Sequence, residues 1–266
     1  MSTLETTLRI FPRLHAPRSW RLVERNIASS RGAWLVFVSG FFEPLFYLFA
    51  MGVGVGALVG TVDVNGQAVG YREFVGPALL AASAMNGAVY ESGNVFFKLK
   101  YAKTYDGVLA TPMTVRDVAL GELTYTLIRG AVYSFGFVTV MLAMGLLDSP
   151  WAVLAIPGAL LVSAAFAAPS VYGITWMRSW ADFAFIELCT LPMFLFSATF
   201  VPADTYPDVV RWLLPLTPLY HGVELLRAFT LGDVTWLVLV DIAYLVALTI
   251  VFLYLADRRL AKLLLK

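Results

Sequence analysis

The sequence predicts an all-α membrane protein with six transmembrane helices. Its 266 residues are 59% hydrophobic and only 14% charged, with a mean hydropathy of +0.76, more than a soluble domain of this size carries. Apolar segments long enough to cross a bilayer recur along the chain, and basic residues collect in alternate connections between them. We also expect an N-terminal interfacial amphipathic helix, a short cytoplasmic helix in the central loop and a short re-entrant helix pair before the last span.

Two regions follow from this pattern. Residues 1–31 hold six arginines among broken apolar stripes, which favours an interfacial helix region on the cytoplasmic leaflet over the alternative, a disordered basic arm. Residues 32–266 are expected to form a single transmembrane domain, with spans over 32–59, 74–97, 118–146, 151–177, 181–200 and 234–256.

The connections between the spans differ in character. Residues 61–73 form a short polar loop, and residues 98–117 form a basic loop. Four prolines divide residues 201–233 into pieces too short to cross the membrane, so we expect two re-entrant helices in the outer leaflet. Residues 257–266 are expected to form a tail.

The distribution of charge gives the topology. Fifteen of the nineteen lysines and arginines fall in the segments predicted to be cytoplasmic, so we expect a multi-pass protein of the cell membrane with both termini in the cytoplasm. The net charge of +1 gives no reason to expect a nucleic-acid partner. The single cysteine, Cys189, excludes an intramolecular disulfide and is expected to be a buried, inert thiol.

The central loop, KLKYAKTYDGVLATPMTVRD, is more regular than a tether. Residues at helical spacing predict a short amphipathic helix, namely Tyr101, Tyr105, Val108 and Leu109. Pro112 ends this helix, and Thr114 with Asp117 forms a weaker version of a capping box that starts the next span. Such a helix can receive a push from a soluble partner and pass it to the membrane domain; an ordinary surface helix is the alternative.

The first and fifth spans carry candidate contact residues. Small residues four apart allow close helix packing, either within one chain or against a second copy: Gly52, Gly56 and Gly60. A second set, which includes one carboxylate at membrane depth, could flank a groove for substrate, although plain packing is the alternative: Phe41, Glu43, Phe46, Tyr47, Phe194, Phe196 and Phe200.

Several other charges lie in the apolar segments. We expect Glu91 to be solvated or paired with a nearby lysine rather than in contact with substrate. Glu122 and Arg129 lie seven residues apart on one helix face, and could bind the same partner or each other's neighbours. The acidic residues leave an ion-gradient-driven secondary transporter open as an alternative function: Glu43, Glu122, Glu187 and Asp241. A membrane assembly factor without transport activity is a third possibility.

Motifs for covalent chemistry are missing. The sequence has no Walker-type phosphate loop, no H-E-x-x-H and no Cys/His cluster, and its two histidines make no credible Ser-His-acid set. We therefore expect no catalytic residue, no metal site and no enzyme activity in this chain.

Four segments resemble the permease subunit of type-2 ATP-binding-cassette exporters, and within that family the nodulation-protein J group and the neighbouring drug and polysaccharide export permeases. They are FFEPLFYLFAMGVGVG from Phe41, the stretch from Ser83 to Glu122 with KTYDGVLATPMTVRDV, LPMFLFSATFVPADTYP from Leu191, and LPLTPLYHGVELLRAFTLG from Leu214. Ala198 departs from the resemblance, because many members carry glycine there; alanine is also small, so we expect close packing to survive.

The resemblance implies partners and a mechanism. Two copies of a separate ATPase subunit would bind beneath two permeases, either two copies of this chain or one copy with a sister permease. ATP and magnesium would bind the ATPase, this chain would bind no cofactor, and the cargo would be an amphipathic or lipid-linked molecule moved outward through surrounding membrane lipids. The helix of the central loop would be the coupling helix that contacts the ATPase, through Tyr101, Lys103, Thr104, Tyr105, Asp106, Gly107, Leu109, Thr111, Pro112, Arg116 and Asp117. Gly52, Gly56, Gly60 and Ala198 would pack between permeases.

Overall fold

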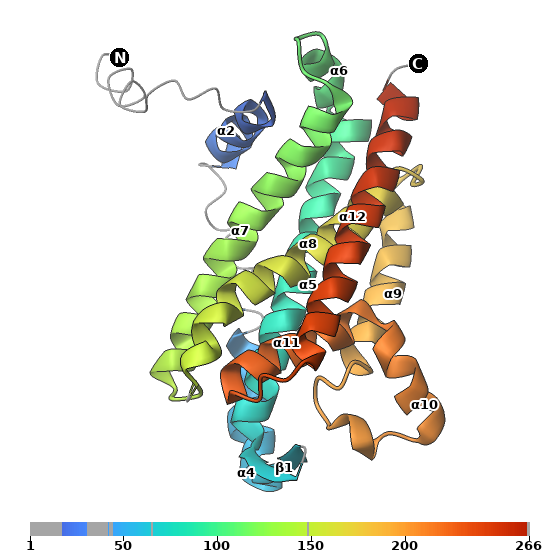
Figure 1. Ribbon diagram of the computed structural model, residues 1–266. Coiled ribbons are helices and arrows are strands. Elements are labelled where there is room, and N and C mark those ends of the chain that lie inside the picture. Colours follow the sequence, from blue (N-terminus) through green and yellow to red (C-terminus); the bar gives the residue numbers. More distant parts are fainter. Residues whose placement is uncertain (1–17, 31–41, 43–44, 65, 148, 265–266) are drawn as a thin grey trace, which may run out of the picture.

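The computed structural model describes residues 18–30, 42, 45–64, 66–147 and 149–264, and most of them are helical (Figure 1). The longer helices are α2 (Arg18–Ser30), α5 (Tyr71–Lys100), α7 (Val115–Ala143), α8 (Ala155–Ile174), α9 (Ala184–Leu195), α11 (Pro218–Leu231) and α12 (Leu237–Leu264). Shorter elements are η1 (Ala50–Val55), α4 (Gly56–Val59), α6 (Thr104–Leu109), η2 (Pro150–Leu154), η3 (Trp180–Phe183), η4 (Ala203–Thr205), α10 (Asp208–Leu213) and η5 (Leu214–Leu216).

Helix α5 runs through the centre of the bundle, where α7, α8 and α11 pack around it. Most of its thirty residues are buried, and Pro77 lies within it. Because protein rather than lipid surrounds α5, this helix can carry polar residues that a lipid-facing span would not tolerate. The core is therefore built around a helix of mixed character.

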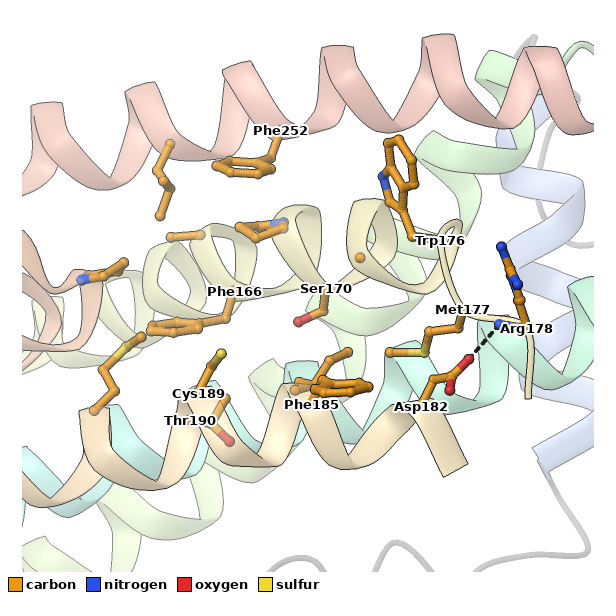
Figure 2. Close-up of a pocket in the computed structure, with 17 residues that line it drawn as sticks. Phe166, Ser170, Trp176, Met177, Arg178, Asp182, Phe185, Cys189, Thr190 and Phe252 are labelled. Atoms are coloured by element: carbon orange, nitrogen blue, oxygen red, sulfur yellow. Dashed lines mark hydrogen bonds between the residues drawn. The ribbon is translucent and has the colours of Figure 1, made fainter. Parts of the chain in front are cut away.

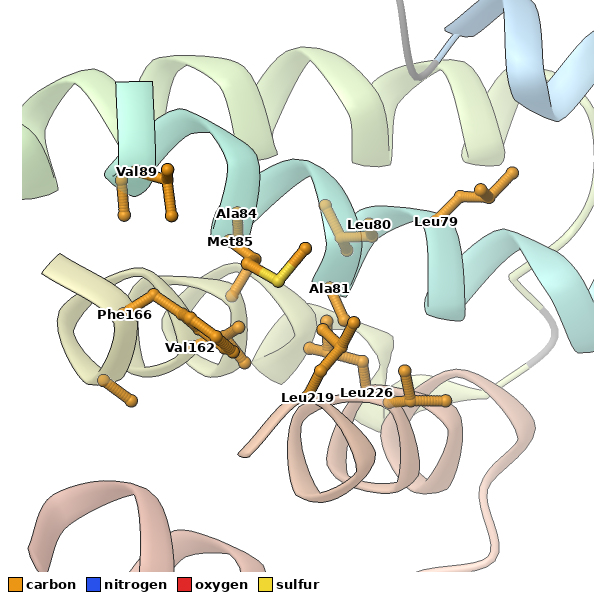
Figure 3. Close-up of a cluster of buried hydrophobic side chains, with 14 of the residues drawn as sticks. Leu79, Leu80, Ala81, Ala84, Met85, Val89, Val162, Phe166, Leu219 and Leu226 are labelled. Atoms are coloured by element: carbon orange, nitrogen blue, oxygen red, sulfur yellow. The ribbon is translucent and has the colours of Figure 1, made fainter. Parts of the chain in front are cut away.

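Close packing of α5, α8 and α11 depends on small residues (Figure 3). Met85 of α5 lies against Val162 and Phe166 of α8. A Cβ atom at Gly158 would lie 2.8 Å from Leu226, and one at Gly222 would lie 2.8 Å from Val162. Glycine at these two positions lets the helices approach more closely than any larger residue would allow.

Within the described residues, three helical segments are long and apolar enough to cross a membrane: Val115–Ala143, Pro150–Ile174 and Leu237–Leu264. Leu45–Val59 is a shorter apolar helix whose preceding segment lies outside the described residues. Helix α5 is about 45 Å long, but it is too polar to be counted as a membrane span by composition. Helix α9 has twelve residues and is about 18 Å long, which is too short to cross a bilayer alone. The count of six spans therefore stays a prediction.

Several connections differ from the expectation. Residues 61–73, expected as a loop, contain a hairpin of β1 (Thr61–Val64) and β2 (Gln67–Gly70), because Thr61 pairs with Gly70 before α5 begins. The predicted tail is also wrong over 257–264, because α12 continues to Leu264. Cys189 is exposed on α9 rather than buried.

The segment before α12 contains the short helices α10 and α11, while their re-entrant placement in the outer leaflet stays a prediction. His221 of α11 fastens this segment to α12. Its Nδ1 lies 2.7 Å from Asp241 Oδ1, its Nε2 lies 2.8 Å from the carbonyl oxygen of Pro215, and its ring stacks on Tyr244 at 4.0 Å. A carbonyl oxygen can only accept a hydrogen bond, so Nε2 of His221 donates to the carbonyl oxygen of Pro215. One further proton is shared between Nδ1 of His221 and the carboxyl group of Asp241.

Ala198 has an unusual backbone conformation. Its φ of 55° lies in the left-handed region, its side chain is fully buried, and its carbonyl oxygen accepts a hydrogen bond of 3.0 Å from Arg227 Nη2. Only glycine adopts this φ without steric cost. The glycine that the family resemblance associates with this position thus has a physical reason.

We predict that Ala198→Gly stabilises the protein by about 1 kcal/mol, because it removes backbone strain. The matched change Ala164→Gly, inside α8, should destabilise it by about the same amount, because glycine weakens a helix interior. Thermal midpoints of the purified variants in one detergent test this, and a lower midpoint for Ala198→Gly would contradict it.

Candidate functional site

Helix α6 lies at the end of the bundle that also carries the C-terminus (Figure 1). Lys103 precedes it with a left-handed φ of 47°, and within it Tyr105 points inward with 1% exposure. The rest of the predicted coupling set lies on or beside this helix. Its exposed members are Tyr101, Lys103, Asp106, Gly107, Thr111, Pro112 and Arg116; its half-buried members are Thr104, Leu109 and Asp117.

The start of α7 is fixed by the capping box that the sequence predicted. Thr114 Oγ1 accepts a hydrogen bond of 3.2 Å from the Asp117 amide, and Asp117 Oδ2 accepts one of 2.8 Å from the Thr114 amide. The bond from this amide lowers the pKa of Asp117, so its carboxylate stays ionised at the helix N-terminus. The α6–α7 connection is therefore a defined structure rather than a loose loop.

The side chain of Glu122, in α7, is the centre of a buried polar cluster. Its carboxylate accepts hydrogen bonds from Lys98 Nζ at 2.8 and 3.0 Å, from Tyr105 Oη at 3.0 Å and from Asn26 Nδ2 at 3.0 Å. Lys98 Nζ also donates to Asn26 Oδ1 at 3.2 Å. We call these four residues the Glu122 cluster; they join α2, α5, α6 and α7 at one point.

Burial makes this cluster energetically demanding. Glu122 is only 1% exposed, so an unpaired charge there would be strongly destabilising, and Lys98 neutralises it. Burial, followed by the negative charge of Glu122, raises the pKa of Tyr105 well above its usual value. The phenol therefore keeps its proton and acts as the donor to Glu122 at physiological pH.

A second ion pair lies about two helical turns farther into the bundle. Arg129 of α7 binds Glu91 of α5, Asn94 donates to Glu91 at 3.2 Å, and Arg129 donates to Tyr133 at 3.0 Å. The prediction that Glu91 pairs with a lysine is wrong, because its partner is Arg129 of the antiparallel helix α7. We call the pairs Lys98–Glu122 and Arg129–Glu91 the charged ladder.

The ladder explains the spacing seen in the sequence. Glu91 and Lys98 are seven residues apart on α5, and Glu122 and Arg129 are seven apart on α7, with the signs reversed. Sequence reasoning recognised only the α7 half. The matching interval on α5 was a signal that could have identified the partners, whereas nothing in the sequence singled out Asn26.

The second rung borders a groove of about 910 Å³ between α5, α7, α9 and the helix preceding α4. Arg129 and Tyr133 form part of its wall, with hydroxyl and amide groups of α5 nearby. Its lining is otherwise aromatic and aliphatic, and includes Tyr47, Ser83, Asn86, Tyr90, Asn94, Glu187, Leu191 and Phe194.

The predicted pathway residues are only partly brought together here. The rings of Tyr47 and Phe194 lie 6.1 Å apart at the groove, and Phe200 packs edge-on against Phe194 at 5.1 Å. Phe46 instead stacks on Phe42, and Phe196 lies beside Tyr206. Phe41 and Glu43 lie outside the described residues.

The glycines predicted for helix packing contact their own chain. A Cβ at Gly52 or Gly56 would lie 3.4 or 3.5 Å from Arg72 Cγ, and Arg72 Nε donates to the Gly52 carbonyl at 2.9 Å. Gly60 has φ of 70° and ends α4, and Ala198 is buried within the chain. These contacts agree with the internal alternative, while packing against a second permease stays a prediction.

We predict that Glu122→Gln destabilises the protein by about 3 kcal/mol, because it leaves the Lys98 ammonium without its counter-charge in a buried site. The same change at Glu187, an exposed carboxylate on α9, should alter stability by no more than about 0.5 kcal/mol. Thermal midpoints in detergent measure the difference; equal midpoints for the two variants would show that the ladder carries no stability.

Comparisons with known proteins agree with this helical, membrane-type architecture. Residues 18–231 match the family model described as ABC-2 type transporter. The chain is 30% identical to Nodulation protein J of Sinorhizobium fredii (strain NBRC 101917 / NGR234), over 79% of this chain and 80% of that protein. It is also 30% identical to Nodulation protein J of Rhizobium leguminosarum bv. trifolii, over 80% of each, and 28% identical to that of Rhizobium meliloti (strain 1021), over 72% of each. The chain is an integral membrane protein that belongs to the ABC-2 type transporter family.

Proposed function

We propose that this chain is the transmembrane permease subunit of an ATP-driven exporter. It moves an amphipathic or lipid-linked substrate outward, such as a lipo-oligosaccharide, a polysaccharide on a lipid carrier, a glycolipid or a drug. It lies in the cell membrane with six spans and both termini in the cytoplasm. Family membership supports the permease role, and the basic residues around α6 support the orientation.

The Glu122 cluster is the observation that carries the mechanism. Helix α6 has an exposed face, which includes Asp106 and Gly107, and a buried residue, Tyr105, that binds Glu122 of α7. A displacement of α6 by an ATPase therefore acts directly on α7. Lys98 passes the same displacement to α5, and Asn26 passes it to α2.

The ladder connects this cluster to the groove. Arg129 of the second rung and Tyr133, to which it donates a hydrogen bond, also line the groove. A tilt of α5 and α7 at the α6 end therefore changes the wall that faces substrate. In this mechanism the chain performs no covalent step, because its two conformations differ in access and affinity while the ATPase supplies the bias between them.

The partners follow from this role. Two copies of a separate ATPase hold the ATP and magnesium, and this chain binds neither. A second permease, identical or a sister chain, completes the path between the first and fifth spans. The crevice between α2 and α6 is lined by Arg18, Arg21 and Arg25, so the ATPase surface that meets it should be acidic.

The gradient-driven alternative has less support. Glu122 and Asp241 are already paired with Lys98 and His221. Glu187 is exposed, away from these pairs, and Glu43 lies outside the described part of the chain. Acids held in separate sites do not form the shared ion-binding site that a coupled transporter needs.

We predict that Asp106→Lys abolishes co-purification of the ATPase, because the longer side chain blocks close contact with the exposed face of α6. Asp208→Lys makes the same charge reversal in the first turn of α10, at the opposite end of the bundle (Figure 1), and should leave co-purification unchanged. Mild-detergent purification of each tagged chain, with mass spectrometry of the bound proteins, measures this. Equal recovery of a Walker-type ATPase with both variants would rule out α6 as the docking site of that ATPase.

We predict that Tyr105→Phe uncouples ATP hydrolysis from movement of the groove, because only the hydroxyl that binds Glu122 is lost. The cargo-independent readout is the ATP-dependent change in maleimide labelling of a cysteine at Asn86, in a chain without Cys189. Tyr105→Phe should keep the ATPase bound and active while the labelling change shrinks several-fold. Tyr254→Phe, at an exposed ring of α12 outside the coupling set, is the control, and an equal effect there would contradict the proposed route.

A further inference from the structure

Helix α9 is unusual because, although strongly apolar, it has no buried residue. The groove described above lies on one side of it. On its other side α8, α9 and α12 enclose a second groove of about 640 Å³, which we call the lateral groove (Figure 2). The lateral groove is lined mainly by apolar side chains, including Phe166, Met177, Phe185, Cys189, Met193 and Phe252.

The surroundings of the lateral groove are those of a lipid-facing surface. Helix α12 forms one wall, and its outer side exposes a run of large apolar residues, among them Leu239, Val240, Ile250 and Val251. Phe185 is 69% exposed at the wall formed by α9. An apolar surface this extensive and concave is normally covered by another molecule.

One end of the lateral groove is basic. Arg178 lines it, and Arg259 of α12 lies with its guanidinium 3.9 Å over the ring of Trp176, another lining residue. Among the described residues, the buried Nε of Arg259 has no hydrogen-bond partner. A guanidinium stacked on a tryptophan at the mouth of an apolar groove, with a second arginine in the lining, has the chemistry that binds a phosphate at a membrane surface.

The acidic groups at this end do not cancel these cations. Asp182 lines the groove as an anion whose carboxylate accepts hydrogen bonds from the backbone amides of Arg178 and Ser179 at 2.7 and 3.1 Å, so that with Asp257 two carboxylates stand against three arginines. Arg258 stacks on Tyr254, and Asp257 directly precedes Arg258 and Arg259 in the sequence of α12. The described charges near the mouth therefore leave an excess of cations.

We propose that the lateral groove binds one anionic phospholipid, with an acyl chain between α8, α9 and α12 and its phosphate at Arg178 and Arg259. The lipid supplies the apolar cover that α9 lacks within its own chain. Because α9 also forms a wall of the substrate groove through Glu187, Leu191 and Phe194, the bound lipid sets the position of that wall. This proposal does not depend on the identity of the cargo or on the energy source.

Cys189 provides a direct test, since it is the single cysteine of the chain, is exposed and lines the lateral groove. The full chain, with the subunits that it retains, is reconstituted in nanodiscs of phosphatidylcholine alone or mixed with phosphatidylglycerol. The rate of reaction with an N-alkyl maleimide is followed by intact mass. A cysteine introduced at Phe135, exposed on α7, corrects for reagent partitioning between the two bilayers.

We expect phosphatidylglycerol to slow the labelling of Cys189 several-fold relative to the cysteine at position 135. The double change Arg178→Gln and Arg259→Gln should remove this protection, whereas Arg258→Gln should keep it. Equal labelling rates of Cys189 for the unmodified chain in both bilayers would overturn the proposal. Slow labelling of Cys189 relative to the cysteine at position 135 in lipid-free detergent would also overturn it, because protein and not lipid would then cover the groove.

Discussion

The ion pair between Lys98 and Glu122 is the constraint on which the rest of the site depends. Both charges lie where water is scarce, so each must stay within reach of the other. The second pair, Arg129–Glu91, repeats the same requirement about two helical turns away. A shift of α5 past α7 by one turn would unpair both rungs at once. The two helices therefore move as one body, and any force on Tyr105 reaches both.

Helix α9 shows the opposite behaviour. The bundle of α5, α7, α8 and α11 is packed through glycines such as Gly158 and Gly222, which tolerate no larger side chain. Helix α9 buries none of its residues and has a groove on each side. A rigid bundle beside a weakly held helix is a suitable arrangement for an alternating path, because a small tilt of the bundle changes the width of the groove against α9.

Much of this architecture could be predicted from local sequence signals. Thr114 and Asp117 marked the start of α7, and the prolines of 201–233 marked two short helices, because capping and proline effects act within a few residues. Signals that depend on distant contacts were missed. The partner of Glu91 lies 38 residues away on α7, and Cys189 is exposed because the described part of the chain leaves every residue of α9 at least partly exposed. The hairpin of β1 and β2 and the extension of α12 to Leu264 were also missed, since short polar strands and a charged helix end both resemble loop in composition.

The most direct test of the central claim, that the Glu122 cluster makes α2 and α6 move together, is a pair of spin-label distances with and without trapped ATP. Labels at Ala28 on α2 and Ala110 at the end of α6 report their separation, and a third label at Thr235, before α12, reports their movement relative to the far end of the bundle. The cluster predicts that ATP changes both distances to Thr235 while the Ala28–Ala110 distance stays fixed, and that Glu122→Gln lets the Ala28–Ala110 distance change. An Ala28–Ala110 distance that varies with ATP in the unmodified protein would contradict it.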